Sequence, residues 1–239
     1  MLLRILAFSS SRVGNETYLQ TASPVIKEFL GAKALSVAFI PFASVDKNYE
    51  AYTGKVREGL NNRLYTVTTV TPSNAKLVIE SCDVIMVGGG NTFKLLHDLY
   101  EMELLELIKQ KVQSGTPYIG WSAGSNITGL TISTTNDMPI IQPQSFKAFG
   151  FFPFQINPHY HNEVTEGFNG ETRDQRLEEF LKMSPSSSIV CLPEGTALKF
   201  EKEVLNFFGK TAGVLMTQKD GMLVRKEIDP ETDLSFLLQ

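Results

Sequence analysis

Short apolar runs rich in β-branched and aromatic residues alternate along the chain with segments whose apolar residues recur at helical spacing. Alternating strands and helices are typical of a largely parallel sheet with helices packed on both of its faces. We therefore predict an α/β protein of this kind. The predicted strands are LLRILAF, LSVAFIPF, LYTVTTV, DVIMVGG, TPYIGWS, FQINP and SSIVCLP.

Helical spacing is clearest in two segments. SPVIKEFLG ends on a glycine that suits a helix C-terminus, and the apolar residues of 92–115 predict one long helix that Gly115 and Pro117 stop. Beyond Glu194 the pattern changes to paired apolar stretches, which predict C-terminal hairpins. The chain shows no internal repeat or linker, so we expect one domain over residues 1–239. The hairpin segments are 196–208, 213–228 with an Asp220-Gly221 turn, and 233–238.

Composition narrows the possible partners and location. The chain has 239 residues, of which 42% are apolar and 20% charged, and its formal net charge is −4 with no basic stripe. Nucleic acid is therefore an unfavourable partner, whereas a small anionic ligand held by one or two local cations is compatible with this charge distribution. No apolar run approaches the roughly 20 residues of a membrane span, and Arg4 interrupts the N-terminal run, which we interpret as a strand and not a signal peptide. Cys82 and Cys191 sit singly at strand edges, so we expect a soluble, cytoplasmic protein with buried thiols.

Four loops carry unusual residues where predicted strands end. In open α/β sheets the sites form at the carboxyl ends of strands, where these loops converge. Candidate chemistry should therefore be sought in four segments. They are GGGNTF at 88–93, WSAGSN at 121–126, NPHYHN at 157–162 and LPEGTA at 192–197.

Ser122 lies in a Gly-x-Ser-x-Gly frame between a predicted strand and a possible helix. Small neighbours permit a strained turn that exposes a nucleophilic hydroxyl while the next backbone N–H, that of Ala123, faces the developing oxyanion. The alternative is a tight turn that only packs a helix against a strand. A base near this serine would favour the first interpretation.

The sequence offers three histidines as a base for Ser122. His97 falls within a helical pattern beside leucines, where a half-buried structural histidine is the simpler interpretation. His159 and His161 follow a predicted strand, and an H-x-H pair also binds zinc, but no matching cysteine or histidine cluster accompanies it. We take His159 as the base, with His161 as the second choice.

Two acids compete for the role of orienting that histidine. Asp137, in TTNDMP, is predicted to follow a short strand, and Glu194, in LPEG, ends a buried strand. Each has a structural alternative, an Asx turn before Pro139 for the first and a solvated turn residue before Gly195 for the second. Glu194 closes a strand that the predicted parallel sheet places among the site loops, so we favour it by a small margin and keep Asp137 as the alternative.

The GGGNTF loop lacks the G-x-G-x-x-G spacing of a dinucleotide site. Glycines after a strand, followed by Asn91 as a helix N-cap, instead present unhindered backbone N–H groups. Gly89 and Gly90 are therefore candidates for the second oxyanion donor, opposite the N–H of Ala123. A tight strand-to-helix turn is compatible with the same residues.

Taken together and in order, FIPFA, VGGGNTF, YIGWSAGSN, TTNDMP, QINPH, GETRDQR and LPEG closely resemble the peptidase E family of α-aspartyl dipeptidases. The resemblance implies a three-layer, flavodoxin-like α/β/α fold related to class I glutamine amidotransferases, with serine in place of their cysteine. It implies hydrolysis of dipeptides with N-terminal aspartate, without metal or cofactor. The sequence leaves open whether the protein is a monomer or a homodimer. Carried over by motif, Ser122 is the nucleophile and His159 the base, while Asp137 and Glu194 both remain candidates for the third member.

Arg173, in GETRDQR, is the candidate for aspartate selectivity. Thr172 and Gln175 form a capping-box pattern, which predicts a helix with Arg173 at its first position. A solvated arginine pointing away from the helix dipole is one interpretation. The other is an anion site in which arginine grips the substrate's side-chain carboxylate with a bidentate fork, and in which Arg176 has a possible share. Asn91 is a further candidate contact to the substrate.

Three other classes of protein fit parts of this pattern. An α/β-hydrolase esterase also uses G-x-S-x-G, but its histidine normally comes late in the chain, and no histidine follows His161. A glutamine amidotransferase would carry a thiol where this chain has Ser122. A non-catalytic binding module on the same fold would show no turnover and no labelling by a serine-directed phosphonate.

Overall fold

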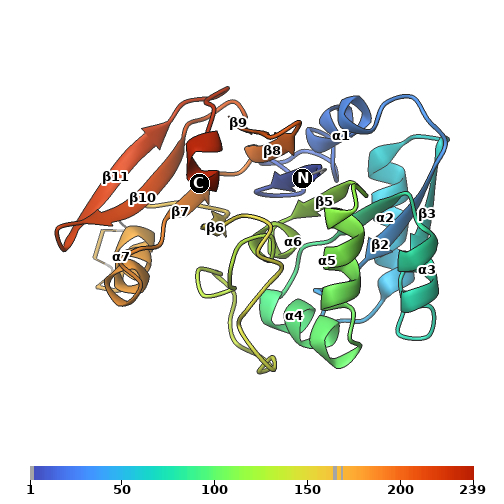
Figure 1. Cartoon of the computed structure of the whole chain (residues 1–239), viewed down its shortest axis with the longest axis horizontal. Coiled ribbons are helices and arrows are strands. Elements are labelled where there is room, and N and C mark those ends of the chain that lie inside the picture. Colours follow the sequence, from blue (N-terminus) through green and yellow to red (C-terminus); the bar gives the residue numbers. More distant parts are fainter. Residues whose placement is uncertain (1–2, 164–165, 168) are drawn as a thin grey trace.

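The computed structural model describes residues 3–163, 166–167 and 169–239. Its central sheet confirms the predicted α/β class. Five neighbouring strands, from β3 to β1, are mutually parallel, and the hairpin of β8 and β9 extends the sheet antiparallel to β1. Figure 1 shows the helices on both sides of this sheet. The strand order is β3 (Tyr65–Thr69), β2 (Leu35–Ile40), β4 (Val84–Val87), β5 (Tyr118–Trp121), β1 (Ile5–Phe8), β8 (Ala197–Glu201) and β9 (Val204–Phe208).

The two faces of the central sheet bury separate apolar clusters, as period-two strands require. Leu6 and Val37 pack with α1 (Ala22–Leu30) and α2 (Tyr49–Leu60). Ile5, Ala38 and Ile85 face the other way. That second face is covered by α3 (Ala75–Ser81), α4 (Thr92–Glu101) and α5 (Leu105–Gln113).

The prediction of one long helix over 92–115 is wrong, because α4 ends at Glu101 and α5 begins at Leu105. Glu103 takes φ of 55°, and the N–H of Leu104 donates to the carbonyl of Leu99 at 2.9 Å. This is a Schellman ending without its usual glycine, so the sequence carries no stop signal there. The apolar spacing continues across the break because Leu104 and Ile108 are both fully buried.

A second sheet lies beside the central one, at the left of Figure 1. The sequence assigned FQINP and SSIVCLP to the main sheet, but they form β6 (Gln155–Pro158) and β7 (Ile189–Leu192), which pair in parallel with each other here. The edge of β1 that they would need is occupied by β8. The rest of this layer is β10 (Gly213–Lys219), β11 (Met222–Ile228) and the covering helix α7 (Arg173–Met183).

The C-terminal hairpins are confirmed in two of three segments. β8 pairs with β9 and β10 with β11, and the second turn places Asp220 and Gly221 at φ of 52° and 78°. The third segment forms the 3-10 helix η1 (Ser235–Leu238) and not a strand.

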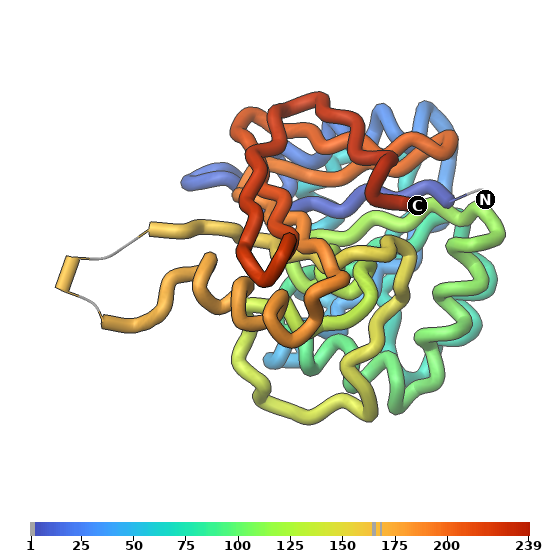
Figure 2. The backbone as a smooth tube through the Cα atoms, turned by 60° about the vertical axis from the view of Figure 1, so that its left-hand side comes forward, coloured from blue at the N-terminus to red at the C-terminus, as the bar shows by residue number. Residues whose placement is uncertain are grey.

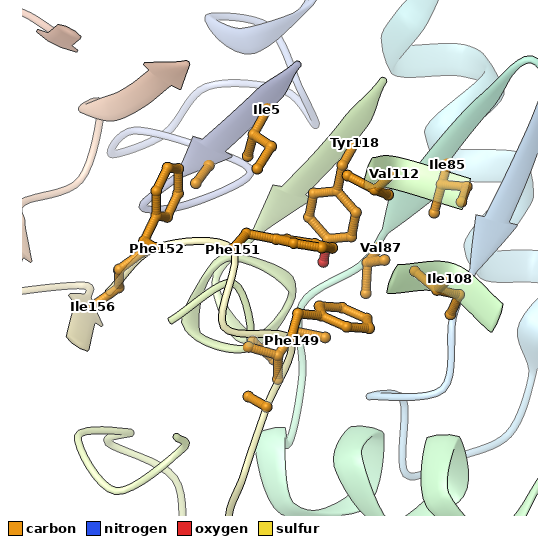
Figure 3. Packing of buried hydrophobic residues seen from close by; sticks show 14 of the residues in the cluster. Ile5, Ile85, Val87, Ile108, Val112, Tyr118, Phe149, Phe151, Phe152 and Ile156 are labelled. Atoms are coloured by element: carbon orange, nitrogen blue, oxygen red, sulfur yellow. The ribbon is translucent and has the colours of Figure 1, made fainter. Parts of the chain in front are cut away.

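The described chain from Ile127 to Phe154 forms no helix or strand, and Figure 2 shows it in yellow-green as a long excursion. The short strand expected before Asp137 is therefore absent, and only an isolated bridge joins Thr131 to Lys147. Aromatic residues near the end of this segment pack it against the central sheet: the rings of Phe149 and Phe151 both lie edge-on against Tyr118 of β5 (Figure 3).

Candidate active site

Ser122 occupies a sharp turn directly after β5. Its φ of 55° and ψ of −115° are strained for a residue with a side chain, and its N–H donates to Phe8 O of the neighbouring strand β1 at 3.1 Å. The flanking glycines are required by contact: a Cβ on Gly120 would lie 2.3 Å from Gly124 O, and one on Gly124 would lie 2.2 Å from Val87 O. The small neighbours thus allow a strained turn in which the Ser122 side chain faces a cavity.

His159 follows β6 and reaches Ser122 from the second sheet. Its Nε2 lies 3.0 Å from Ser122 Oγ, and its Nδ1 lies 2.8 Å from Oε1 of Glu194. Donation of the Nδ1 proton to the glutamate leaves Nε2 as the acceptor for the serine hydroxyl, which is the tautomer that a general base needs. The arrangement has the geometry of a Ser-His-Glu triad.

Pairing of two parallel strands brings His159 and Glu194 together. Pro158, at the end of β6, lies opposite Leu192, at the end of β7, so both following loops leave the same edge of the second sheet. The side chains of His159 and Glu194 are 41% and 49% exposed, respectively. Solvent therefore screens their electrostatic coupling, and hydrogen-bond geometry is the main constraint on the imidazole.

Ser9 joins the two sheets at this point. This fully buried residue follows β1, and its hydroxyl accepts from the N–H of His159 at 2.9 Å while donating to Leu192 O at 2.7 Å. The residue before it, Phe8, accepts from the N–H of Ser122. One end of β1 thus fixes the backbones of both the serine and the histidine.

Three backbone N–H groups near Ser122 have no acceptor among the described residues, those of Gly89, Gly90 and Ala123. Gly89 lies against the serine, since a Cβ there would come within 2.9 Å of Ser122 Cβ. Tyr52 holds the loop by donating its hydroxyl proton to Gly89 O at 3.1 Å. Unpaired N–H groups on both sides of a nucleophile are the arrangement that stabilises an oxyanion.

Asp137 lies at the start of α4 and does not contact His159. Its Oδ2 accepts from the N–H of Thr92 at 2.7 Å and from the hydroxyls of Thr92 and Thr135 at 2.5 and 3.2 Å. Asn91 caps the same helix, accepting from Lys94 N at 3.0 Å, and also lines the cavity beside Ser122. The structure therefore separates the two candidate acids and brings only Glu194 to the imidazole.

The predicted helix start at Arg173 is confirmed, because Thr172 caps α7 and Gln175 closes the capping box. The guanidinium of Arg173 donates to Oδ1 of Asn136, whose Nδ2 in turn donates to Pro158 O at 2.7 Å. Burial lowers the pKa of Arg173. Arg173 does not line the cavity that contains Ser122.

Arg176 and the other two histidines point elsewhere. Arg176 pairs with Glu171 at 3.8 Å. His97 contacts its neighbour Asp98, and His161 lies 3.3 Å from a carboxylate oxygen of Glu163. Within the described ranges, no group of three or more histidine, cysteine, aspartate or glutamate side chains is placed to hold a metal ion.

The cavity beside Ser122 and His159 has a volume of about 640 Å³. One wall is aromatic: the hydroxyl of Tyr52 accepts from Tyr18 O–H at 3.0 Å and from Trp121 Nε1 at 3.2 Å. Burial raises the pKa of both tyrosines, so they remain neutral donors at ordinary pH. The lysine, arginine and acidic residues that line the cavity are Arg12, Asp46 and Lys55.

Comparison with known proteins identifies the family. The model of peptidase family S51 matches residues 5–207. This chain belongs to peptidase family S51. It is 45% identical to a peptidase E of Nostoc over 240 residues, covering 100% of this chain and 98% of the relative. It is 47% identical to a peptidase E of Shewanella denitrificans over 220 residues, covering 92% and 93%.

Solved structures show the same fold at lower identity. A candidate peptidase E from Listeria monocytogenes superposes with a TM-score of 0.67 at 22% identity, covering 87% of this chain and 99% of the other. A peptidase from an acI-B1 Actinobacterium gives a TM-score of 0.68 at 16% identity, covering 98% and 96%. The activity class rests on the family match and the two peptidase E relatives, which make the protein a serine peptidase of the peptidase E type.

Sequence reasoning missed Ser9 and Tyr52 at the candidate active site. A signal existed for the first, because Ser9 directly follows a predicted buried strand, the position where site residues gather in parallel sheets. Tyr52 gave no such signal, since it lies on α2 and reaches the glycine loop only through tertiary packing.

Of the described helices, none is long and apolar enough to cross a membrane.

Proposed function

We propose that this serine peptidase is an α-aspartyl dipeptidase, which hydrolyses Asp-Xaa dipeptides through an acyl-enzyme on Ser122 and needs no metal. One observation carries the proposal: the relay from Ser122 Oγ through His159 to Glu194, with separations of 3.0 and 2.8 Å. The buried free thiols of Cys82 and Cys191 fit the reducing cytoplasm, which we include in the proposal.

In the proposed reaction, His159 Nε2 takes the proton of Ser122 as Oγ attacks the peptide carbonyl of the aspartyl residue. Negative charge then develops on the carbonyl oxygen, where the N–H of Ala123 and an N–H of Gly89 or Gly90 donate to it. The imidazolium, held by Glu194, passes its proton to the leaving amine. Water repeats the sequence on the acyl-enzyme and releases free aspartate.

Selectivity for aspartate is assigned to Arg173 within the same proposal. Its half-buried guanidinium has no carboxylate partner among the described residues and donates only to the neutral amide of Asn136. A substrate carboxylate is a stronger acceptor than that amide, and the fork of arginine matches its two oxygens. Asparagine would leave the cation unpaired, and glutamate would place its carboxylate about one methylene too far away.

Recognition of the free α-ammonium is assigned to Asp137, with Asn91 as a further contact. Oδ2 of Asp137 accepts every hydrogen bond that the described structure gives this carboxylate, and Oδ1 is left for a ligand. A dipeptidase must read the free amine of its substrate, and a carboxylate is the group that does so by charge.

Hydrolysis of four dipeptides tests this function. Purified protein is incubated with Asp-Leu, Glu-Leu, Asn-Leu and Ala-Leu, each with and without a chelator, and released leucine is measured. We expect release from Asp-Leu alone, unchanged by the chelator. Release from Ala-Leu at an equal rate would contradict aspartate selectivity, loss of activity with chelator would contradict the metal-free mechanism, and no release at all would favour a binding module.

A further inference from the structure

Two cations on the wall of the cavity beside Ser122 have no carboxylate partner among the described residues. Arg12, in the loop after β1, and Lys55, on α2, are both exposed and both line the cavity that contains Ser122. Neither forms an ion pair with any described residue, whereas Arg57, two positions further along α2, pairs with Glu50 at 2.5 Å. The cavity wall thus offers unneutralised positive charge within a chain whose formal net charge is −4.

The charge on this wall suits a ligand with more than one carboxylate. Asp46 is the one acid among the lining residues, against the two cations Arg12 and Lys55. The wall therefore carries a net positive charge even when His159 is not counted. Like charges gathered at a cavity raise the local concentration of ligands of opposite sign. An Asp-Xaa dipeptide brings two carboxylates, one on its first side chain and one at its C-terminus, and therefore needs two anion-binding positions.

Exposure distinguishes which cation suits which carboxylate. Rejection of asparagine requires a cation in fixed geometry, a condition met by the half-buried Arg173 on α7. The C-terminal carboxylate instead sits on a leaving residue of variable size, so its position shifts from one substrate to another. Long, solvated side chains such as Arg12 and Lys55 can follow that shift.

We propose that Arg12 and Lys55 bind the C-terminal carboxylate of the leaving residue and so make the enzyme prefer dipeptides over amidated or longer substrates. This inference rests on the proposed aspartyl dipeptidase function. It places the leaving residue in the cavity between Ser122 and α2, where the rings of Tyr52 and Trp121 supply an apolar wall for its side chain. The aspartyl residue then lies toward Arg173, on the side of the second sheet.

The test compares Asp-Leu with Asp-Leu amide, which differ only in the C-terminal charge. The parent should favour Asp-Leu in kcat/KM, and Arg12→Met and Lys55→Met should each lower that preference about three- to fivefold, chiefly through KM for Asp-Leu. The double variant should lower it about tenfold, and 0.5 M salt should weaken it in the parent. Values for the amide should stay within about twofold throughout.

Matched variants separate this effect from general changes in surface charge. Arg63→Met removes an exposed arginine that does not line the cavity, and it should leave the preference unchanged. Asp46→Asn removes a carboxylate from the same wall and should raise the preference slightly. Lys55→Arg keeps the charge and should retain most of the preference of the parent.

Two results would overturn the inference. An equal loss for Asp-Leu and its amide would mean that these cations do not read the C-terminus, and an unchanged preference in the double variant would mean that they bind nothing. Hydrolysis of aspartyl p-nitroanilide, which lacks a C-terminal carboxylate, tests the dipeptidase function separately. If the parent cleaves neither compound, calorimetric binding of Asp-Leu and its amide to Ser122→Ala, with and without Arg12 and Lys55, still decides the inference.

Discussion

The two halves of the candidate active site are held in different ways. Ser122 sits on the central sheet in a turn fixed by close backbone contacts, where its flanking glycines leave no space for even a methyl group. His159 and Glu194 extend from the second sheet on side chains that are nearly half exposed, and the hydrogen bond between them orients the imidazole. The comparison teaches that the proposed nucleophile is positioned by local steric contacts and the proposed base by the docking of two sheets.

Removal of the proposed nucleophile should have the largest effect on activity. Ser122→Ala removes the attacking atom and little volume, so hydrolysis of Asp-Leu should fall at least about a thousandfold while the fold is kept. Initial rates and circular dichroism measure the two quantities. A variant that retained more than a few per cent of the parent activity would end the serine mechanism.

The close backbone contacts around Ser122 predict that Gly124→Ala strongly lowers both stability and activity. The added Cβ would meet Val87 O at 2.2 Å, so the elbow must shift, and we expect a loss of about 1–3 kcal/mol in unfolding free energy. Activity should fall about a hundredfold or more as the serine moves. Gly54→Ala is the control, since its Cβ meets nothing within 4 Å on α2. Equal denaturation midpoints and rates for both variants would contradict local steric control.

The two acids should affect different kinetic constants. Glu194→Gln should lower kcat about a hundredfold, because the imidazolium loses its charged partner, with little change in KM. Asp137→Asn should instead raise KM about tenfold, because the substrate ammonium loses an anion. Steady-state kinetics with Asp-Leu measure both, and the opposite pattern would exchange the roles of these residues.

Ser9 connects the central sheet to the second sheet, so its replacement tests whether the docking of the two sheets positions His159. Ser9→Ala removes the hydroxyl that accepts from His159 N–H and donates to Leu192 O, so the histidine should lose its register with Ser122 and kcat should fall about tenfold at unchanged KM. Ser23→Ala deletes another buried hydroxyl, which donates from α1 to Leu60 O of α2 at 3.1 Å, and should leave kcat unchanged. Equal kcat in the two variants would show that Ser9 contributes no more than ordinary packing.

Much of the central sheet and the serine elbow could be predicted because their signals are local. Strand patterns and the glycines around Ser122 act over a few residues. The division into two sheets depends on β8 occupying the edge of β1, a pairing between segments almost 200 residues apart that no local pattern encodes. For the same reason the sequence could not decide which acid orients His159. Asp137 and Glu194 both lie in segments that could belong to the site, and it is the register of β6 with β7 that brings Glu194 to His159.

Phosphonate labelling followed by mass spectrometry tests the central claim most directly, namely that a serine on one sheet is activated by a histidine-glutamate pair on another. We predict a single adduct on the peptide that contains Ser122. Its rate of formation should fall at least about a hundredfold in His159→Ala and markedly in Glu194→Gln, but should not change in Asp137→Asn. An adduct on another residue, or equal labelling rates in the parent and His159→Ala, would contradict the account.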